Sequence, residues 1–231
     1  MHQLNDFKHR ADLDNALASN VAEILSNAIS HKGKASLAVS GGSTPKGFFT
    51  ALSNKDIDWQ NVTVTLADER WVEFNSEASN TRLVHENLLK NKASAAIFFH
   101  LKKDGECNEK TLAQLNTDAK KSLLPLDVLI LGMGEDGHTA SIFPCSDQLS
   151  TALALDNSDA LMKVVPQTAP NDRITFTYSH LVQSKNIILH VCGEGKKIVL
   201  EKALASNNQK EMPIRAFLQN PDVNTQVYWA E

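Results

Sequence analysis

The chain has 231 residues, of which 42% are hydrophobic and 22% are charged, and this composition is close to the average of globular proteins. It excludes a disordered chain, a coiled coil and a collagen-like fibre, and the length suits one domain spanning residues 1–231. The 23 basic and 27 acidic residues give a formal net charge of −4, which offers no basic excess for a nucleic-acid backbone.

Hydrophobic periodicity predicts helices that alternate with strands along the whole chain. The first helix is expected over residues 12–32 with Asp12 as its cap, so that only one helix precedes the first strand. A second helix is expected after residue 44, with Ser43 or Thr44 as its cap and Pro45 in its first turn. Later helices are predicted over residues 81–90, 110–122 and 196–204. Strands are predicted over residues 35–39, 62–66, 96–99, 128–131, 173–178, 186–191 and 223–229.

Several of these strands are apolar at every position, which is typical of parallel strands covered on both faces. The alternation of strands and helices predicts a layered α/β fold with a mostly parallel sheet. Ligands of such folds bind at the carboxyl ends of the strands. Three polar motifs follow predicted strands, namely SGGSTPK, ADER and GMGEDGH. Their shared position at strand ends is the main functional signal in the sequence.

The three cysteines are widely spaced and form no C-x-x-C motif, so neither a disulfide framework nor a zinc site is expected. Cys192 lies in an apolar run and is expected to be a buried free thiol. No run approaches the roughly 18 apolar residues of a membrane span. The first residues lack the apolar core of a signal peptide, which predicts a cytoplasmic protein without a membrane partner.

The SGGSTPK motif has the chemistry of a phosphate site. Gly41 and Gly42 let the backbone turn tightly beside a ligand, Ser43 and Thr44 offer hydroxyls, and the following helix presents free N–H groups. The spacing differs from the G-x-x-x-x-G-K-[ST] loop of nucleoside triphosphatases, so a monophosphate ester is the better match. The alternative interpretation is a turn with an ordinary helix cap.

The GMGEDG segment matches G-x-G-x-x-G after an apolar strand, but a dinucleotide site is not expected. Glu135 and Asp136 would repel a pyrophosphate, and no long amphipathic helix follows. The glycines are expected instead to shape a loop that holds Asp136 and His138 over a site. An imidazole titrates near neutrality and suits a general base. No second ligand at metal-binding spacing accompanies His138, so no zinc is expected.

The remaining candidates are charged residues at the starts and ends of predicted elements. In the ADER motif, Asp68 is expected on sugar hydroxyls and Arg70 near developing negative charge, unless the triplet is a solvated turn. Arg173 opens a strand and Lys196 opens a helix. Each is either a surface cation or part of a phosphate clamp.

Taken together, these motifs resemble the signatures of the 6-phosphogluconolactonase family. SGGSTPKGFF, LADERWV, the Ser79-Asn80 pair with Arg82, and LGMGEDGHTASIFP occur in the family's order, and PNDRIT, GEGKK and MPIR are weaker matches. The resemblance covers about residues 10–229. It implies a three-layer α/β/α sandwich of the sugar-phosphate isomerase type. It also implies hydrolysis of 6-phosphoglucono-δ-lactone to 6-phosphogluconate in the oxidative pentose phosphate pathway, without a cofactor or metal.

The resemblance also implies roles for the candidate residues. His138 would take a proton from the water that attacks the lactone carbonyl. Arg70 and backbone N–H groups would stabilise the oxyanion. The loop over residues 42–44, with Arg173 and Lys196, would anchor the phosphate. The only partner expected is this small sugar phosphate, and the protein is expected to be a monomer.

Two other functions are weighed against this one. Glucosamine-6-phosphate deaminases/isomerases are similar in fold, but their histidine segment reads GHIAFNEP, and here Phe143 occupies the position of its glutamate. The ring-opening relay of that family would therefore be incomplete. A non-catalytic sugar-phosphate sensor would carry a helix-turn-helix domain, and residues 1–34 are too few for one.

Overall fold

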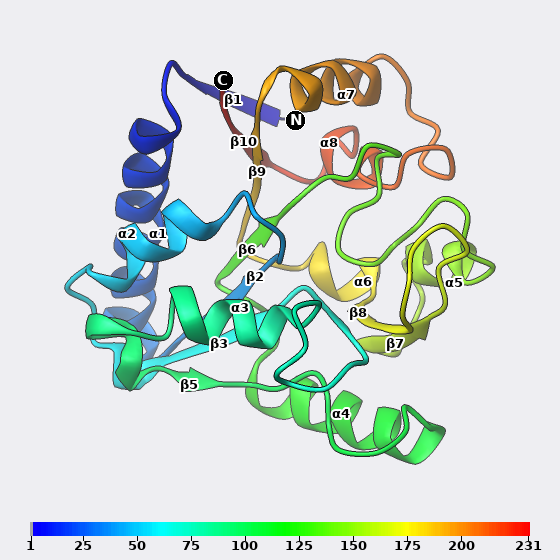
Figure 1. Cartoon of the computed structure of the whole chain (residues 1–231), viewed down its shortest axis with the longest axis horizontal. Coiled ribbons are helices and arrows are strands. Elements are labelled where there is room, and N and C mark those ends of the chain that lie inside the picture. The colour runs from blue at the N-terminus through cyan, green and yellow to red at the C-terminus, as the bar shows by residue number, and fades with distance from the viewer. Residues whose placement is uncertain (1) are drawn as a thin grey trace.

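The computed structural model describes residues 2–231 and contains two sheets (Figure 1). The large sheet has seven parallel strands, in the order β1 (His2–Phe7), β10 (Thr225–Ala230), β9 (Asn186–Cys192), β6 (Val128–Leu131), β2 (Ala35–Val39), β3 (Val62–Leu66) and β5 (Ile97–Phe98). The small sheet is antiparallel, in the order β4 (Asp68–Arg70), β8 (Arg173–Phe176) and β7 (Leu161–Val164).

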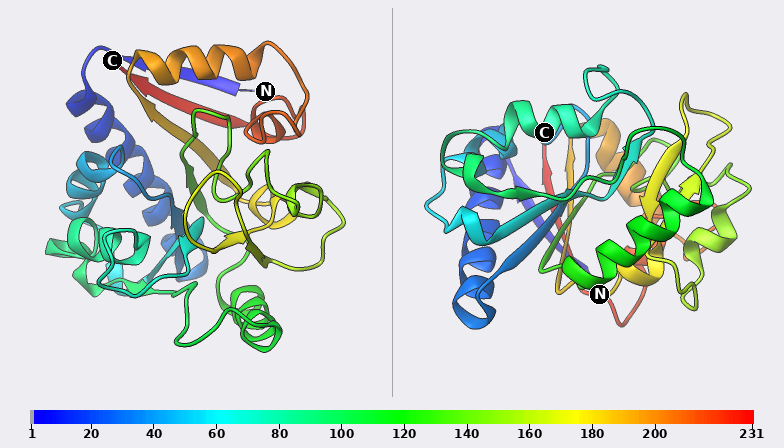
Figure 2. Two further views of the ribbon diagram at one scale, coloured as in Figure 1. Left: turned by 45° about the vertical axis from the view of Figure 1, so that its right-hand side comes forward. Right: turned by 90° about the horizontal axis from the view of Figure 1, so that it is seen from below.

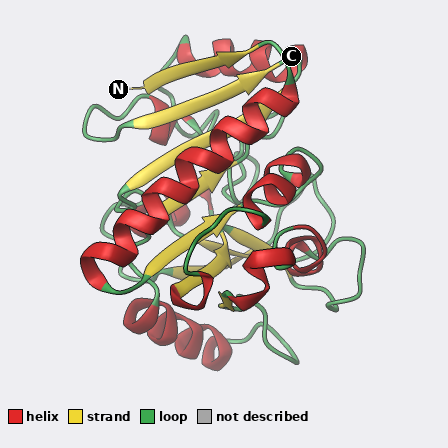
Figure 3. Cartoon of the chain, turned by 90° about the vertical axis from the view of Figure 1, so that its left-hand side faces the viewer, coloured by secondary structure: helices red, strands yellow, loops and turns green. Residues whose placement is uncertain are grey.

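Helices cover both faces of the large sheet. The helices that precede β5 in the chain are α1 (Arg10–Lys32), α2 (Lys46–Ser53) and α3 (Asn80–Asn87), with the 3-10 helices η1 (Trp59–Asn61) and η2 (Asn91–Ala95). Those that follow it are α4 (Glu109–Ser122), α5 (Leu149–Leu153), α6 (Tyr178–Leu181), α7 (Glu194–Leu204) and α8 (Arg215–Leu218). Figure 3 shows α1 lying across one face of the strands, and the views of Figure 2 place α1 and α4 on either side of them. The predicted three-layer α/β/α fold is confirmed.

The order of the strands explains where a ligand site forms. From β1 to β5 each connection moves toward the β5 edge, and from β5 to β10 each moves back. Right-handed crossovers therefore put the two sets of helices on opposite faces. The neighbours β2 and β6 belong to different sets, so the loops that leave their carboxyl ends diverge. Such a switch point leaves a crevice in which ligands of α/β sheets bind.

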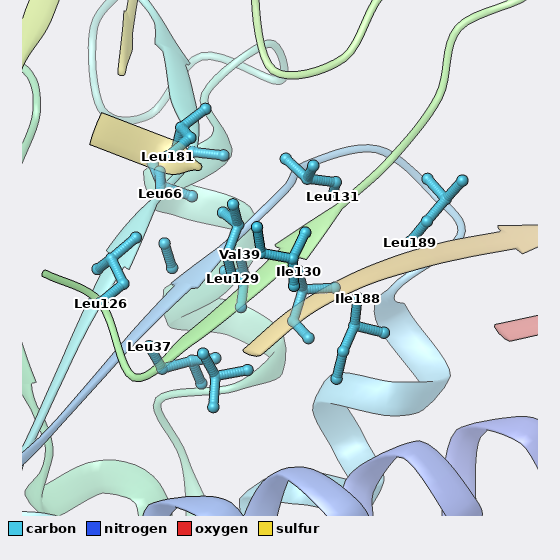
Figure 4. Close-up of a cluster of buried hydrophobic side chains, with 14 of the residues drawn as sticks. Leu37, Val39, Leu66, Leu126, Leu129, Ile130, Leu131, Leu181, Ile188 and Leu189 are labelled. Atoms are coloured by element: carbon cyan, nitrogen blue, oxygen red, sulfur yellow. The ribbon is translucent and has the colours of Figure 1, made fainter. Parts of the chain in front are cut away.

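The central strands hold this crevice in place because both of their faces are buried. Every residue of β2 and of β6 is buried. Figure 4 shows their leucines, isoleucines and valines packed with those of the neighbouring β3 and β9. Burying one such side chain contributes about 1.5–3 kcal/mol. The strand ends, and the loops that begin there, are therefore firmly positioned.

Several details differ from the sequence-based expectations. The strand β1 precedes the first helix, where no strand was predicted. Its polar side chains are mostly exposed, and backbone pairing with β10 alone makes it a strand. The short strands β4 and β7 were also missed.

The helix boundaries differ as well. The helix α1 begins at Arg10 with His9 at the N-cap, so Asp12 lies inside it. Pro45 is the N-cap of α2, and neither Ser43 nor Thr44 caps that helix.

Two further observations concern the cysteines and the helices. All three cysteines are free, and Cys192 is buried, as predicted. No helix in residues 2–231 combines the length and the apolarity needed to cross a membrane.

Candidate active site

A pocket of about 310 Å³ opens at the carboxyl ends of β2, β6 and β9. Nine of the ten predicted site residues line it, and they come from five separate segments of the chain. They are Gly41, Gly42, Ser43, Thr44, Asp68, Arg70, His138, Arg173 and Lys196. The tenth, Asp136, contacts His138 directly. The pocket is large enough for a single sugar phosphate, because ligand sites of roughly 300–1,000 Å³ hold small molecules.

The loop after β2 is held against β4 by Asn80. A Cβ on Gly41 would lie 1.9 Å from the Oδ1 atom of Asn80, so only glycine allows this side chain to pack on the loop backbone. The Nδ2 group of Asn80 donates to the carbonyl oxygen of Asp68 over 3.0 Å. Gly42 follows with a φ of 93°, which favours glycine. The turn of the loop is therefore set by two glycines and one buried amide.

The amino end of α2 is reached from the opposite side by Asp14 of α1. The carboxylate of Asp14 accepts a hydrogen bond from the backbone of Phe48, and a Cβ on Gly47 would lie 1.9 Å from its Oδ2 atom. Burial raises the pKa of Asp14 more than this hydrogen bond and Arg10 lower it. Ser43 and Thr44, which do not cap α2, line the pocket.

His138 lies on a tight turn that follows β6. The backbone N–H of Gly134 donates to the carbonyl of His138 over 2.8 Å, and Gly137 has a φ of 75°. The Nδ1 atom of His138 is 2.5 Å from the Oδ1 atom of Asp136, and the ring lies 4.3 Å from the ring of Phe143, measured between centroids. With Nδ1 donating to the carboxylate, Nε2 is the nitrogen that can accept a proton.

The carboxylate of Asp136 is charged when it holds this ring. Burial raises its pKa, but the hydrogen bonds from the side chain and backbone of His138 lower it further, so that the net pKa lies below the usual range. An ionised carboxylate on Nδ1 orients the imidazole and fixes its tautomer. An imidazole held in this way has the geometry that a general base requires.

Arg70 and Arg173 face each other as register partners in the β4–β8 pair. Arg70 donates from Nη1 to the carbonyl of Ala78 over 2.6 Å, and Arg173 donates from Nη2 to the carbonyl of Pro170 over 3.3 Å. Within the described residues, the buried Nε atoms of both arginines have no hydrogen-bond partner. Burial, and then the charge of Arg70, lower the pKa of Arg173. Two adjacent guanidinium groups with unused donors form a site for an anion.

Asp68 of the ADER motif lies at the pocket, whereas Glu69 supports the fold. Asp68 lines the pocket, but its Oδ2 atom already accepts a hydrogen bond of 2.5 Å from the Oγ atom of Ser141. Glu69 is 1% exposed and accepts hydrogen bonds from the backbones of Asn80 and Thr81 at the start of α3. Glu69 therefore joins β4 to α3, a role that the sequence did not suggest.

Lys196 lies in the first turn of α7, which begins at Glu194 rather than at Lys196 as predicted. Its Nζ atom is 2.6 Å from the Oε1 atom of Glu135, in the turn that carries His138. The side chain of Lys196 is 25% exposed and lines the pocket. A cation thus faces the pocket from the side of α7, in addition to the two arginines of the small sheet.

Sequence reasoning missed one histidine of the pocket. His190 is not among the predicted site residues, but it lines the pocket from β9. It is 3% exposed, and its Nδ1 atom has no partner among the described residues. Burial, and then Arg10, lower its pKa to about 4. The available signal was a polar residue near the carboxyl end of a strand whose neighbours are all apolar.

Comparisons with known proteins agree on one family. The model of the family described as glucosamine-6-phosphate isomerases/6-phosphogluconolactonase matches residues 8–229. A 6-phosphogluconolactonase of Rhizobium meliloti (strain 1021) is 45% identical over 224 residues, which are 97% of each chain. One of Neisseria meningitidis serogroup A is 44% identical and covers 98% of each chain. The crystal structure of a 6-phosphogluconolactonase from Shewanella baltica OS155 superposes with a TM-score of 0.96, at 43% identity, over 100% of this chain and 98% of that one. The chain belongs to the glucosamine-6-phosphate isomerase/6-phosphogluconolactonase family.

Proposed function

We propose that the chain hydrolyses 6-phosphoglucono-δ-lactone to 6-phosphogluconate. The observation that carries this proposal is the placement of His138, held by Asp136, in a pocket whose other charged groups are mainly cations. A base beside a cationic pocket suits the attack of water on an anionic ester. The relatives named 6-phosphogluconolactonase, at 44–45% identity over nearly the whole chain, support the same activity.

In the proposed reaction, Nε2 of His138 removes a proton from water as the water attacks the lactone carbonyl. Asp136 holds the ring through Nδ1 and stabilises the imidazolium that forms. The imidazolium then returns the proton to the ring oxygen as the carbon–oxygen bond of the lactone breaks. The immediate product is a carboxylic acid with a hydroxyl on the same open chain. The acid then releases a proton to solvent and becomes the carboxylate, so atoms and charge balance.

The cations of the pocket are assigned to the phosphate of the substrate and to the carbonyl oxygen, which becomes negative during the reaction. We expect the loop over residues 42–44, Arg173 and Lys196 to hold the phosphate, and Arg70 to stabilise the oxyanion. Phe143 contacts the ring of His138 and also lies 5.7 Å from the guanidinium carbon of Arg173, so the base and the arginine pair are near neighbours. The two ends of one small sugar can therefore reach both groups.

The experiment that tests the proposal generates the lactone in situ with glucose-6-phosphate dehydrogenase and follows its loss against the spontaneous rate. The wild-type enzyme should accelerate this loss. His138→Ala should lower kcat by about 10²- to 10⁴-fold, the usual contribution of a positioned acid–base group. Asp136→Asn should also lower kcat, because the ring loses its oriented tautomer.

Binding of 6-phosphogluconate, measured by calorimetry, is the control for His138→Ala. It should survive, because the phosphate is held by other residues. If His138 only stabilises its loop, His138→Asn should lose stability and product binding together with activity. A folded variant with normal product binding and near-full turnover would contradict the assignment of the base.

The deaminase alternative is tested with glucosamine-6-phosphate in the same assay. We expect no turnover of this compound, because Phe143 stands where that family has the glutamate of its relay. Its side chain is 3% exposed and packs against His138. Release of ammonia at a rate comparable to lactone hydrolysis would favour the alternative.

We also expect one domain that acts as a monomer in the cytoplasm, without a cofactor or metal. Residues 2–231 bring together no group of three or more His, Cys, Asp or Glu side chains that could hold a metal ion. Light scattering coupled to gel filtration, and activity after treatment with EDTA, test these two expectations.

A further inference from the structure

The proposed reaction gives no role to Glu135, a charged residue beside the pocket. Glu135 lies in the turn between β6 and His138, and its carboxylate is 2.6 Å from the ammonium group of Lys196. The ion pair joins this turn to the first turn of α7. It therefore links the segment that carries the base to the segment that carries a phosphate-binding cation.

The two partners of this ion pair differ in their exposure. The side chain of Glu135 is 74% exposed, whereas that of Lys196 is 25% exposed and lines the pocket. Ion pairs with one partner in water are weak, because the carboxylate is well hydrated when it is released. The pair can therefore open at little cost, while the ammonium group stays at the pocket.

A phosphate group is a stronger partner for Lys196 than Glu135 is. It carries up to two negative charges, and its oxygens accept charge-assisted hydrogen bonds from several donors at once. The loop over residues 42–44 lines the same pocket as Lys196 and provides further donors. A phosphate in the pocket and the carboxylate of Glu135 then compete for one ammonium group.

We propose that Glu135 is an intramolecular competitor for Lys196, which the phosphate of the substrate displaces on binding. The inference rests on the proposed role of Lys196 in the phosphate clamp. Because the product carries the same phosphate, Glu135 weakens the binding of substrate and product alike. It thereby sets the affinity of the site and limits the retention of product.

The test compares Glu135→Gln with Glu194→Gln. Both residues are exposed acids near Lys196, but within residues 2–231 only Glu135 forms an ion pair with it. Glu135→Gln should lower both the KM for the lactone and the Kd for 6-phosphogluconate by about two- to fivefold, the range expected for an exposed ion pair. Glu194→Gln should leave both constants near the wild-type values. Equal effects of the two substitutions would overturn the proposal, since they would report only the net charge.

A double-mutant cycle with Lys196→Ala separates this inference from the function on which it rests. In the Lys196→Ala background, Glu135→Gln should have no further effect, because the competed group is gone. If Lys196→Ala alone leaves KM and Kd unchanged, the clamp itself is wrong. If Lys196→Ala weakens binding but Glu135→Gln does not strengthen it, the clamp stands and the competition by Glu135 is refuted.

Discussion

The amino and carboxyl ends of the large sheet both bury charged side chains, and the two sets differ in their partners. At the amino end, Asp127 precedes β6 and is 1% exposed. Its carboxylate is 2.8 Å from the Nζ atom of Lys32 and 3.1 Å from that of Lys185, and it accepts a hydrogen bond of 2.8 Å from the backbone of Ser36. At this end the charge is neutralised within the protein itself.

At the carboxyl end, Lys196 is paired with Glu135, but the guanidinium groups of Arg70 and Arg173 keep buried Nε atoms without a hydrogen-bond partner among the described residues. Four buried polar atoms in the described residues lack a hydrogen-bond partner, and three of them belong to residues that line the pocket, namely Arg70, Arg173 and His190. A buried donor without a partner costs about 1–3 kcal/mol. The comparison teaches that a buried charge with partners supports the fold, whereas buried polar atoms without partners gather where a ligand is expected to bind.

The largest effect that tests this comparison is expected at Asp127. Asp127→Asn should lower the free energy of unfolding by about 2–3 kcal/mol at pH 7, because hydrogen bonds to a charged group are lost and two lysines lose their counter-charge. Turnover and KM should stay at wild-type values, since Asp127 lies at the end of the sheet remote from the pocket. Urea unfolding and the lactone assay measure the two quantities. A change in KM would show that the two ends are not independent.

The same residue makes a prediction about pH. Burial raises the pKa of Asp127, but Lys32, Lys185 and Ser36 together lower it further, so the folded pKa lies below the unfolded one. Its contribution to stability is therefore complete above the unfolded pKa of about 3.9 and is lost as the pH falls through the folded pKa. The cost of Asp127→Asn should accordingly shrink in strong acid.

His190 should respond to pH in a different window. Its folded pKa of about 4 is below the unfolded value of about 6.5, so the unfolded chain binds a proton first as the pH falls. The folded protein therefore loses roughly 2–3 kcal/mol of stability from this residue between pH 6.5 and 4. His190→Leu removes this loss. As the pH falls from 6.5 to 4, the free energy of unfolding of the variant should therefore rise relative to that of the wild type. A difference that does not vary with pH would contradict the assignment of a buried neutral imidazole.

The smallest effect on stability is expected at Arg173. Its replacement should leave stability unchanged or raise it, but should weaken the binding of substrate. Arg173→Leu removes a buried charge whose Nε atom has no partner. The unliganded protein should be unchanged or more stable by about 1 kcal/mol, because replacing poorly satisfied buried charges by apolar groups is often neutral or stabilising. The KM should rise by about tenfold or more, since a charge-assisted hydrogen bond to the phosphate is lost. A large loss of stability would place Arg173 with Asp127 as a structural charge.

The sequence predicted the parts of the fold that periodicity and apolar runs determine. The buried strands β2, β3, β6 and β9, and the long helices, were found because their burial requires apolar residues at set positions. The strand β1 was missed because backbone pairing at a sheet edge requires no such pattern. The carboxylate that accepts a hydrogen bond from the first turn of α2 was not predicted, because it belongs to Asp14, which is distant in the sequence.

The candidate site was predicted better than the partners within it. The motifs at strand ends gather in one pocket because parallel strands end at one edge. Nothing in the sequence indicated that Asp68 is bonded to Ser141, that Lys196 is paired with Glu135, or that two arginines would face each other. Such pairs depend on which loops meet, and only the folded arrangement determines that.

The strand β1 covers the edge of the sheet that β10 would otherwise form. The strand β10 is almost wholly buried and carries the apolar sequence VYWA, and β1 covers its backbone along one side. The side chains of Gln3 and Asp6 are exposed, whereas Asn5 is half-buried and donates from Nδ2 to the carbonyl of Val227 over 3.4 Å. Without the first seven residues, β10 would become an apolar sheet edge open to pairing with another chain, which is a common route to aggregation. Removal of β1 should therefore increase the tendency of the protein to aggregate.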